Sequence, residues 1–130
     1  MRVVLDTHVW IWYLLGDSRL TDAHRRTIED QGVELWISAI TVWEAHLLIE
    51  RGRLPVTQPA SVWIPLALRT LPVREAAITF AIATRSRALT LMHEDPADRF
   101  IAATAVEMKA PLLTSDDRLL ACPQLQALAP

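Results

Sequence analysis

The sequence predicts an α/β protein in which a mostly parallel central sheet of about four to five strands is flanked by helices. Short apolar runs that suit buried strands alternate along the chain with segments of helical spacing. Alternation of this kind produces a parallel sheet with both faces covered. No repeat or low-complexity stretch divides the 130 residues, so we expect a single domain over residues 1–130.

The expected strands are short apolar runs that end at polar or turn-forming residues. They are residues 2–5, 34–37, 70–73, 111–114 and 125–128. Residues 2–5 and 34–37 are typical of strands buried on both faces. Pro72 removes a backbone donor, which suggests that the third strand lies at a sheet edge.

The expected helices follow these strands or begin at capping residues. They are residues 9–15, 22–30, 39–51, 60–69, 74–87 and 96–109, with a short helix ending at Leu120. The helix from Pro96 has the best-defined start, because Asp95 can accept from the free amide groups of its first turn. Gly16 can close the first helix, and Pro65 can kink the fourth.

Composition limits the class of protein. The apolar fraction is 52% and the mean hydropathy is +0.22, so we expect some apolar surface to meet a protein partner. Polar residues interrupt every apolar run before the ~20 residues that cross a bilayer. With Cys122 as the single cysteine and no signal-peptide pattern, the expected location is the cytoplasm, with no membrane attachment.

The net charge of −2 does not indicate nucleic-acid binding, so any basic surface must be local. Lys109 is the sole lysine among 13 basic residues, and the forked arginine side chain suits contacts with phosphate. Arg85, Arg87 and Arg99 are the candidate contacts to a nucleic-acid backbone. Ordinary solvated charges are the alternative.

Three acidic residues fall where expected strands end or helices begin. Asp6 and Asp116 follow strands, and Asp98 lies in the first turn after Pro96. The carboxyl ends of parallel strands meet at one sheet edge, where ligands bind in open α/β sheets. Each acid by itself could be an ordinary helix cap. Their common location favours a shared site.

Glu44 supplies a fourth candidate. It lies in the apolar stripe of its helix, one turn after Ile40 and one turn before Leu48. An unpaired ionised carboxylate would cost several kcal/mol there, or would take up a proton. An ion pair with an arginine is the alternative to a shared acidic site.

Four carboxylates in one cleft predict a divalent metal ion. Two such charges 4 Å apart repel by about 4 kcal/mol at an effective dielectric constant of 20. A site made only of oxygen ligands favours Mg²⁺, with Mn²⁺ as a substitute. Mg²⁺ held by carboxylates activates water for attack on phosphorus, so hydrolysis of phosphodiester bonds is the expected chemistry.

The order of these segments resembles the PIN-domain ribonucleases, and most of all the toxins of VapBC-type toxin-antitoxin pairs. The matching segments are Asp6-Thr7-His8, Ser38 to Glu44, Asp95-Pro96-Ala97-Asp98-Arg99 and Leu113-Thr114-Ser115-Asp116. The match spans nearly the whole chain, and its specificity lies in the four-part order.

The resemblance implies a PIN-like three-layer α/β/α fold and a Mg²⁺-dependent endoribonuclease toxin of a type II toxin-antitoxin system. Such a toxin is silenced by a cognate antitoxin and usually forms a homodimer. The catalytic residues and metal ligands would be Asp6, Glu44, Asp98 and Asp116, with Thr114 and Thr7 in support. Asp117 adjoins the matched position and could share the role of Asp116.

The antitoxin groove implied by the resemblance would be formed by the early helices. Trp10, Trp12, Trp43 and Trp63 could line it, although core packing is the commoner role of tryptophan. The alternative functions are a PIN-like nuclease that is not a toxin and acts on other RNA or DNA, a catalytically inactive binding module, and a phosphoacceptor module. The phosphoacceptor module is disfavoured because such a site needs a lysine at the end of a strand, whereas Lys109, the sole lysine, falls within a helix.

Overall fold

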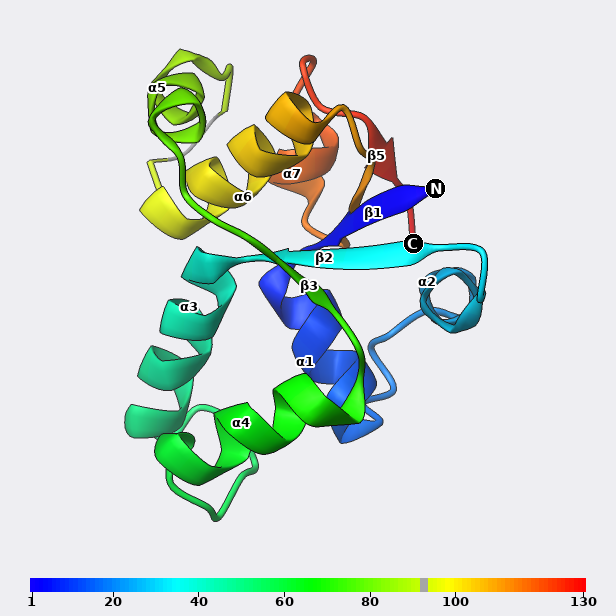
Figure 1. Ribbon diagram of the computed structural model, residues 1–130, viewed down its shortest axis with the longest axis vertical. Coiled ribbons are helices and arrows are strands. Elements are labelled where there is room, and N and C mark those ends of the chain that lie inside the picture. The colour runs from blue at the N-terminus through cyan, green and yellow to red at the C-terminus, as the bar shows by residue number, and fades with distance from the viewer. Residues whose placement is uncertain (92–93) are drawn as a thin grey trace.

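The computed structural model of the protein describes residues 1–91 and 94–130 (Figure 1). The strands in this part are β1 (Arg2–Leu5), β2 (Glu34–Ser38), β3 (Arg74–Ala76), β4 (Leu112–Leu113) and β5 (Ala127–Leu128). The helices are α1 (Thr7–Leu15), α2 (Asp22–Glu29), α3 (Ala39–Glu50), α4 (Ala60–Thr70), α5 (Phe80–Ala88), α6 (Pro96–Met108) and α7 (Asp117–Leu120).

The five described strands form one sheet in the order β3-β2-β1-β4-β5, and every described pairing is parallel. The chain moves outward from β1 in one direction through β2 and β3, and then places β4 and β5 on the other side of β1. The strand order therefore switches direction at β1. In such sheets a ligand-binding crevice forms beyond the carboxyl ends of the strands at the switch point. The predicted α/β class is confirmed.

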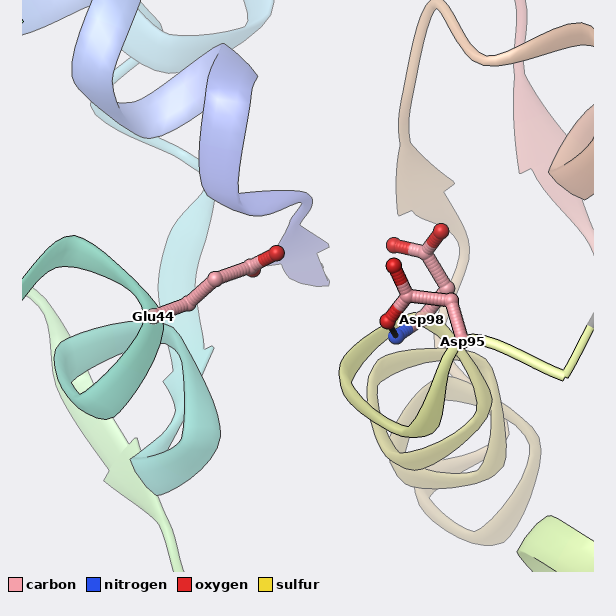
Figure 2. A group of neighbouring side chains, drawn as sticks. All are labelled: Glu44, Asp95 and Asp98. Carbon is pink, nitrogen blue, oxygen red and sulfur yellow. Dashed lines mark hydrogen bonds between the residues drawn. The ribbon is translucent and has the colours of Figure 1, made fainter. Parts of the chain in front are cut away.

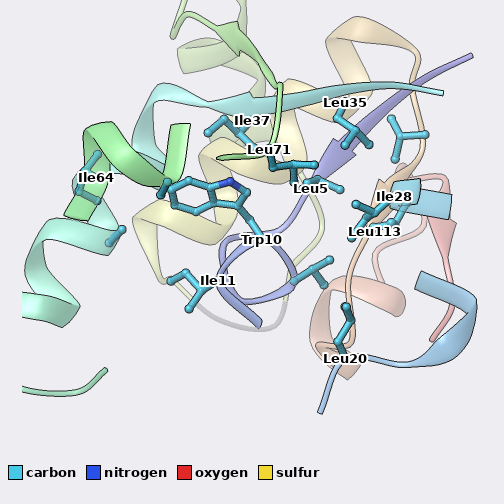
Figure 3. Close-up of a cluster of buried hydrophobic side chains, with 14 of the residues drawn as sticks. Leu5, Trp10, Ile11, Leu20, Ile28, Leu35, Ile37, Ile64, Leu71 and Leu113 are labelled. Atoms are coloured by element: carbon cyan, nitrogen blue, oxygen red, sulfur yellow. The ribbon is translucent and has the colours of Figure 1, made fainter. Parts of the chain in front are cut away.

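Helices cover both faces of the sheet (Figure 1). Side chains of β1 alternate between the two cores: Val3 and Leu5 pack with α1 to α4, whereas Val4 packs with α5 to α7. The first core surrounds the fully buried Trp10 (Figure 3). Trp10 meets Trp63 edge to face with ring centroids 6.0 Å apart, so two of the four tryptophans considered for a groove are core residues.

The strongest helix signals in the sequence are confirmed. Asp95 caps α6 by accepting from the backbone amide groups of Ala97 and Asp98, and Pro96 occupies the first turn. Gly16 ends α1 in the left-handed conformation at φ 63°, which an L side chain rarely adopts. No helix among residues 1–91 and 94–130 is both long and apolar enough to cross a membrane.

The segment 70–88 differs from the prediction. Residues 70–73 are not a strand: α4 continues to Thr70, and β3 begins at Arg74. Residues 74–76 pair with the free edge of β2, and α5 begins only at Phe80, after the Thr79 cap. Pairing with β2 therefore outweighs the weak helical pattern of residues 74–76. Pro72 precedes β3 and lies outside the sheet, so the edge position inferred from it does not apply, although β3 itself is an outer strand.

Candidate metal centre

The residue after β1, the second turn of α3 and the starts of α6 and α7 bring five carboxylates to one pocket of about 370 Å³. Its acidic lining residues come from four separate places in the chain: Asp6, Glu44, Asp95, Asp98 and Asp116. Figure 2 shows the Glu44 side chain extending from α3 towards Asp95 and Asp98 at the start of α6. The structure thus brings together all four acids that the sequence singled out.

Three of these residues could hold one cation between them. One carboxylate oxygen from each of Glu44, Asp95 and Asp98 lies within 4.8 Å of the other two. Oxygen donors so arranged suit Mg²⁺ or Mn²⁺. The sequence indicates only a capping role for Asp95, and its Oδ1 atom does cap α6. The spacing of three residues between Asp95 and Asp98 was the available signal, because such residues are neighbours on a helix surface.

Asp6 is the most deeply buried of the acids, with 5% of its surface exposed. Its Oδ1 accepts from the Thr7 amide group at 2.9 Å, and its Oδ2 accepts from the Thr114 hydroxyl group at 2.7 Å. Burial raises the pKa of Asp6, and the hydrogen bond from Thr114 opposes this rise. Thr114 therefore stabilises the ionised form, which is the form that binds a metal ion.

Glu44 has a buried carboxylate oxygen whose negative charge a cation would balance. Burial raises the pKa of Glu44, while a hydrogen bond from Thr7 lowers it. The Oε1 atom is buried and has no hydrogen-bond partner within the described part of the chain. Leaving such an atom unpaired costs about 1–3 kcal/mol, more for a charged group. Among these same residues no arginine forms an ion pair with Glu44, so the alternative explanation for this buried acid fails.

Asp98 is half-buried among other acids. Burial, followed by the negative charges of Asp6, Asp95, Glu44 and Asp116 in that order, raises the pKa of Asp98 to about 8. Without a cation the folded protein therefore keeps a proton on Asp98 near neutral pH. A divalent ion would have to displace this proton in order to bind. The five carboxylates are therefore better suited to bind a metal ion together than to stay ionised side by side without one.

Asp116 and Asp117 are adjacent in the sequence but have different environments: Asp116 is the cap of α7, and Asp117 is its first residue. Asp116 lines the pocket, caps α7 and forms an ion pair with Arg118, whose Nη2 lies 3.2 Å from Oδ2. Its backbone amide also donates to the Thr114 hydroxyl oxygen at 3.1 Å. Asp117 is exposed and is not one of the residues described as lining the pocket. Asp116 is the better placed of the two to bind a metal ion.

The prediction that Arg99 contacts RNA needs correction. Arg99 is 6% exposed, and its Nη1 donates to the backbone carbonyl oxygens of Ser86 at 2.9 Å and Leu89 at 3.2 Å. Its guanidinium group therefore joins α6 to the end of α5. Arg85 and Arg87 lie at the surface in ion pairs with acidic residues, and their contact with RNA stays a prediction.

Further residues that line the acidic pocket include His8, Trp12 and Arg19. The sequence suggested Trp12 only for the antitoxin groove, and it did not single out His8 or Arg19 as functional. His8 and Trp12 are one helical turn apart on α1, with ring centroids separated by 5.9 Å. The Arg19 guanidinium lies 5.0 Å from the Trp12 ring centroid. Their helical spacing was visible in the sequence, but the position of Arg19 depends on the turn after α1.

The fold and site define a class: α/β proteins with a parallel sheet and a cluster of acidic residues at its carboxyl edge. The model of the PIN domain family matches residues 3–123, and the chain belongs to this family. It is 36% identical over 118 residues to Ribonuclease VapC22 of Mycobacterium tuberculosis, covering 90% of this chain and 88% of that protein.

Solved structures share the same fold at low sequence identity. VapBC2 from Rickettsia felis, bound to a promoter DNA fragment, matches with a TM-score of 0.75 at 15% identity, covering 99% of this chain and 98% of the other. A toxin-antitoxin complex from Klebsiella pneumoniae matches with a TM-score of 0.65 at 21% identity, covering 95% and 94%. VapBC-1 from nontypeable Haemophilus influenzae matches with a TM-score of 0.68 at 20% identity, covering 99% of this chain and 98% of the other.

Proposed function

We propose that this protein is the toxin of a type II toxin-antitoxin system, an endoribonuclease that hydrolyses RNA phosphodiester bonds with Mg²⁺. The observation that carries the proposal is the gathering of oxygens from Glu44, Asp95 and Asp98 within 4.8 Å, in the pocket that Asp6 also lines. PIN domain membership and the 36% identity to a ribonuclease support nuclease activity.

The proposed ligands are Asp6, Glu44, Asp98 and Asp116, with Asp95 added by the structure; Mn²⁺ is expected to substitute for Mg²⁺. A bound ion of this kind supplies an activated water molecule and stabilises the charge that develops on the phosphate. The hydrogen bonds from Thr114 to Asp6 and from Thr7 to Glu44 favour the ionised carboxylates and so oppose the rise in pKa that burial causes. Asp98 would have to lose its proton in order to bind a cation.

The N-terminal ends of two helices support this chemistry. Asp6 caps α1 and Asp95 caps α6, so each of these carboxylates lies at the positive end of a helix dipole, whereas α7, which Asp116 caps, is a single turn of four residues. Such positions stabilise negative charge by about 0.3–1 kcal/mol each. They partly offset the repulsion between the acids and would favour a phosphate group at the same edge.

A cognate antitoxin, a homodimer and a location in the cytoplasm complete the proposal. The antitoxin is supported by the Klebsiella structure, which is a toxin-antitoxin complex. Apolar side chains available for protein contacts are exposed on α3 and α4: Trp43 is 52% exposed, Val62 49% and Leu66 45%. Trp43, one of the tryptophans suggested for the antitoxin groove, is therefore available to a partner.

The experiment expresses the chain without an antitoxin and compares it with Asp6→Asn. The wild type should arrest growth, and its purified form should cut RNA with Mg²⁺ or Mn²⁺ but not with EDTA. Asp6→Asn should do neither. Equal growth arrest by both forms would contradict the metal-site account. Metal-dependent cleavage without growth arrest would instead indicate a PIN nuclease that is not a toxin.

A further inference from the structure

We propose that the substrate RNA strand leaves the acidic pocket across His8, Trp12 and Arg19 and reaches Arg53. This inference rests on the proposed ribonuclease function and adds the path of the strand beside the metal site. We call the first three residues the α1 ridge, although Arg19 belongs to the turn that follows α1. The ridge offers stacking surfaces for bases, and Arg53 offers a positive charge for a phosphate.

The shape of the surface links the ridge to the site. All three ridge residues line the acidic pocket and also line a second hollow of about 190 Å³. The remaining wall of this second hollow is apolar apart from Arg53, and it comes from α1, α3 and the segment that follows α3: Ile11, Leu15, Leu48, Arg53, Leu54 and Pro55. Because the two hollows share the ridge as a wall, they adjoin each other.

The charge of the surface reverses along this path. Five carboxylates line the acidic pocket, whereas the residues described as lining the second hollow include two arginines and a histidine but no acid. Arg53 is exposed, and no described carboxylate forms an ion pair with it. A polyanion with one phosphate at a metal-loaded acidic site must place its next phosphates where acids are absent.

The ridge has the chemistry of a stacking platform. The His8 and Trp12 ring centroids are 5.9 Å apart, and the Arg19 guanidinium lies 5.0 Å from the Trp12 ring centroid. Asp17 holds Arg19 in place, with Nη2 and Oδ2 separated by 2.7 Å. Proteins stack splayed bases of single-stranded RNA on such aromatic and guanidinium planes. Asp17 balances the charge of Arg19, so Arg53 is the stronger candidate for a phosphate contact.

The test measures binding of a short, labelled, single-stranded RNA of mixed sequence with a hydrolysis-resistant backbone by fluorescence anisotropy, at a fixed Mg²⁺ concentration that keeps the acidic site loaded. Salt is varied between about 50 and 200 mM. Arg53→Gln should weaken binding several-fold and reduce the slope of log affinity against log salt by about 1. Arg53→Lys should restore most of that slope. Arg69→Gln, an exposed arginine at the end of α4, is the matched control and should bind like the wild type.

Trp12→Ala tests the stacking surface, with an expected loss of about fivefold or more. Thermal unfolding shows whether this variant folds, and the exposed Arg53 keeps the inference testable if it does not. Equal RNA affinity of Arg53→Gln and Arg69→Gln, or no binding by the wild type, would overturn the proposed path. If Arg53→Gln weakens only the binding of purified antitoxin, the second hollow is a protein interface and the inference is wrong. Metal-dependent cleavage and its loss in Asp6→Asn test the proposed function independently.

Discussion

The Thr114 hydroxyl group donates a hydrogen bond to Asp6 Oδ2 at 2.7 Å, joining residues 108 positions apart in the sequence. The same hydroxyl oxygen accepts from the backbone amide of Asp116 at 3.1 Å. Thr114 thus links the residue after β1 to the residue that caps α7. Because both atoms of the first bond are buried, its removal should change the ionisation and the orientation of Asp6 together.

Thr114→Val keeps the shape of the side chain but removes the hydroxyl group. The pKa of Asp6 should rise further, and Mn²⁺ affinity should fall by about 10-fold to 100-fold, as for other groups that orient metal ligands. Isothermal titration calorimetry measures this affinity. Thr114→Ser, which keeps the donor, should bind nearly as well as the wild type. Equal affinity of the valine variant and the wild type would show that this hydrogen bond has no role at the site.

The stability of the metal-free protein should fall as pH rises. Asp98 in the folded protein has a pKa of about 8, against 3.8 normally, so between these values the folded state keeps a proton that the unfolded chain has lost. The free energy of unfolding therefore decreases over this range. Burial also raises the pKa values of Asp6 and Glu44, which adds to the same trend.

Thermal unfolding in EDTA at about pH 5 and about pH 8.5 measures this effect. The wild-type Tm should be lower at the higher pH. Asp98→Asn should reduce this difference and should be more stable than the wild type at the higher pH, although it binds metal poorly. Asp117→Asn is the control and should keep the wild-type difference. A wild-type Tm that is higher at about pH 8.5 than at about pH 5 would contradict the assignment of this proton to Asp98.

Arg99 should matter for stability because its guanidinium group binds two backbone carbonyl oxygens inside the protein. Arg99→Met leaves those oxygens without their donor, which should cost about 2–4 kcal/mol of unfolding free energy in urea. Arg87→Ala is the matched control: its ion pair with Glu94 is exposed, so the change should stay within about 0.5 kcal/mol. Similar losses in both variants would contradict the structural role of Arg99.

The neighbouring acids Asp116 and Asp117 should behave differently when each is changed to asparagine. Asp116 lines the pocket, whereas Asp117 is exposed. Asp116→Asn should weaken Mn²⁺ binding by about 10-fold or more, and Asp117→Asn by less than about twofold. Calorimetric titration of both variants under one set of conditions makes the comparison. A larger loss of Mn²⁺ affinity in Asp117→Asn than in Asp116→Asn would contradict the choice of Asp116 as the metal ligand.

The fold and most of the acidic cluster could be predicted because they depend on local signals. The apolar runs before Asp6 and Asp116 indicate strands, and parallel strands end at one edge, so two distant acids had to lie close together. Asp95 followed by Pro96 fixed the start of α6 and with it the position of Asp98. Glu44 stood out because a charge within an apolar stripe needs a partner.

The remaining features depend on tertiary contacts that no local pattern records. Residues 74–76 join the sheet because β2 offers a free edge, and their own spacing favours a helix. Arg99 looked like a surface arginine because its sequence neighbourhood does not reveal the carbonyl groups of α5 that it meets. Arg19 reaches the pocket only because the turn after α1 brings it over Trp12.

The central claim is that the gathered carboxylates form a metal site, and the position of a bound ion tests it most directly. Crystals of the protein soaked in Mn²⁺ would reveal the ion by its anomalous scattering. We expect Mn²⁺ in the acidic pocket, within about 2.0–2.4 Å of oxygens from Asp98 and from at least one of Asp6, Glu44 and Asp95. An empty pocket at saturating Mn²⁺, or Mn²⁺ bound only elsewhere, would contradict the account.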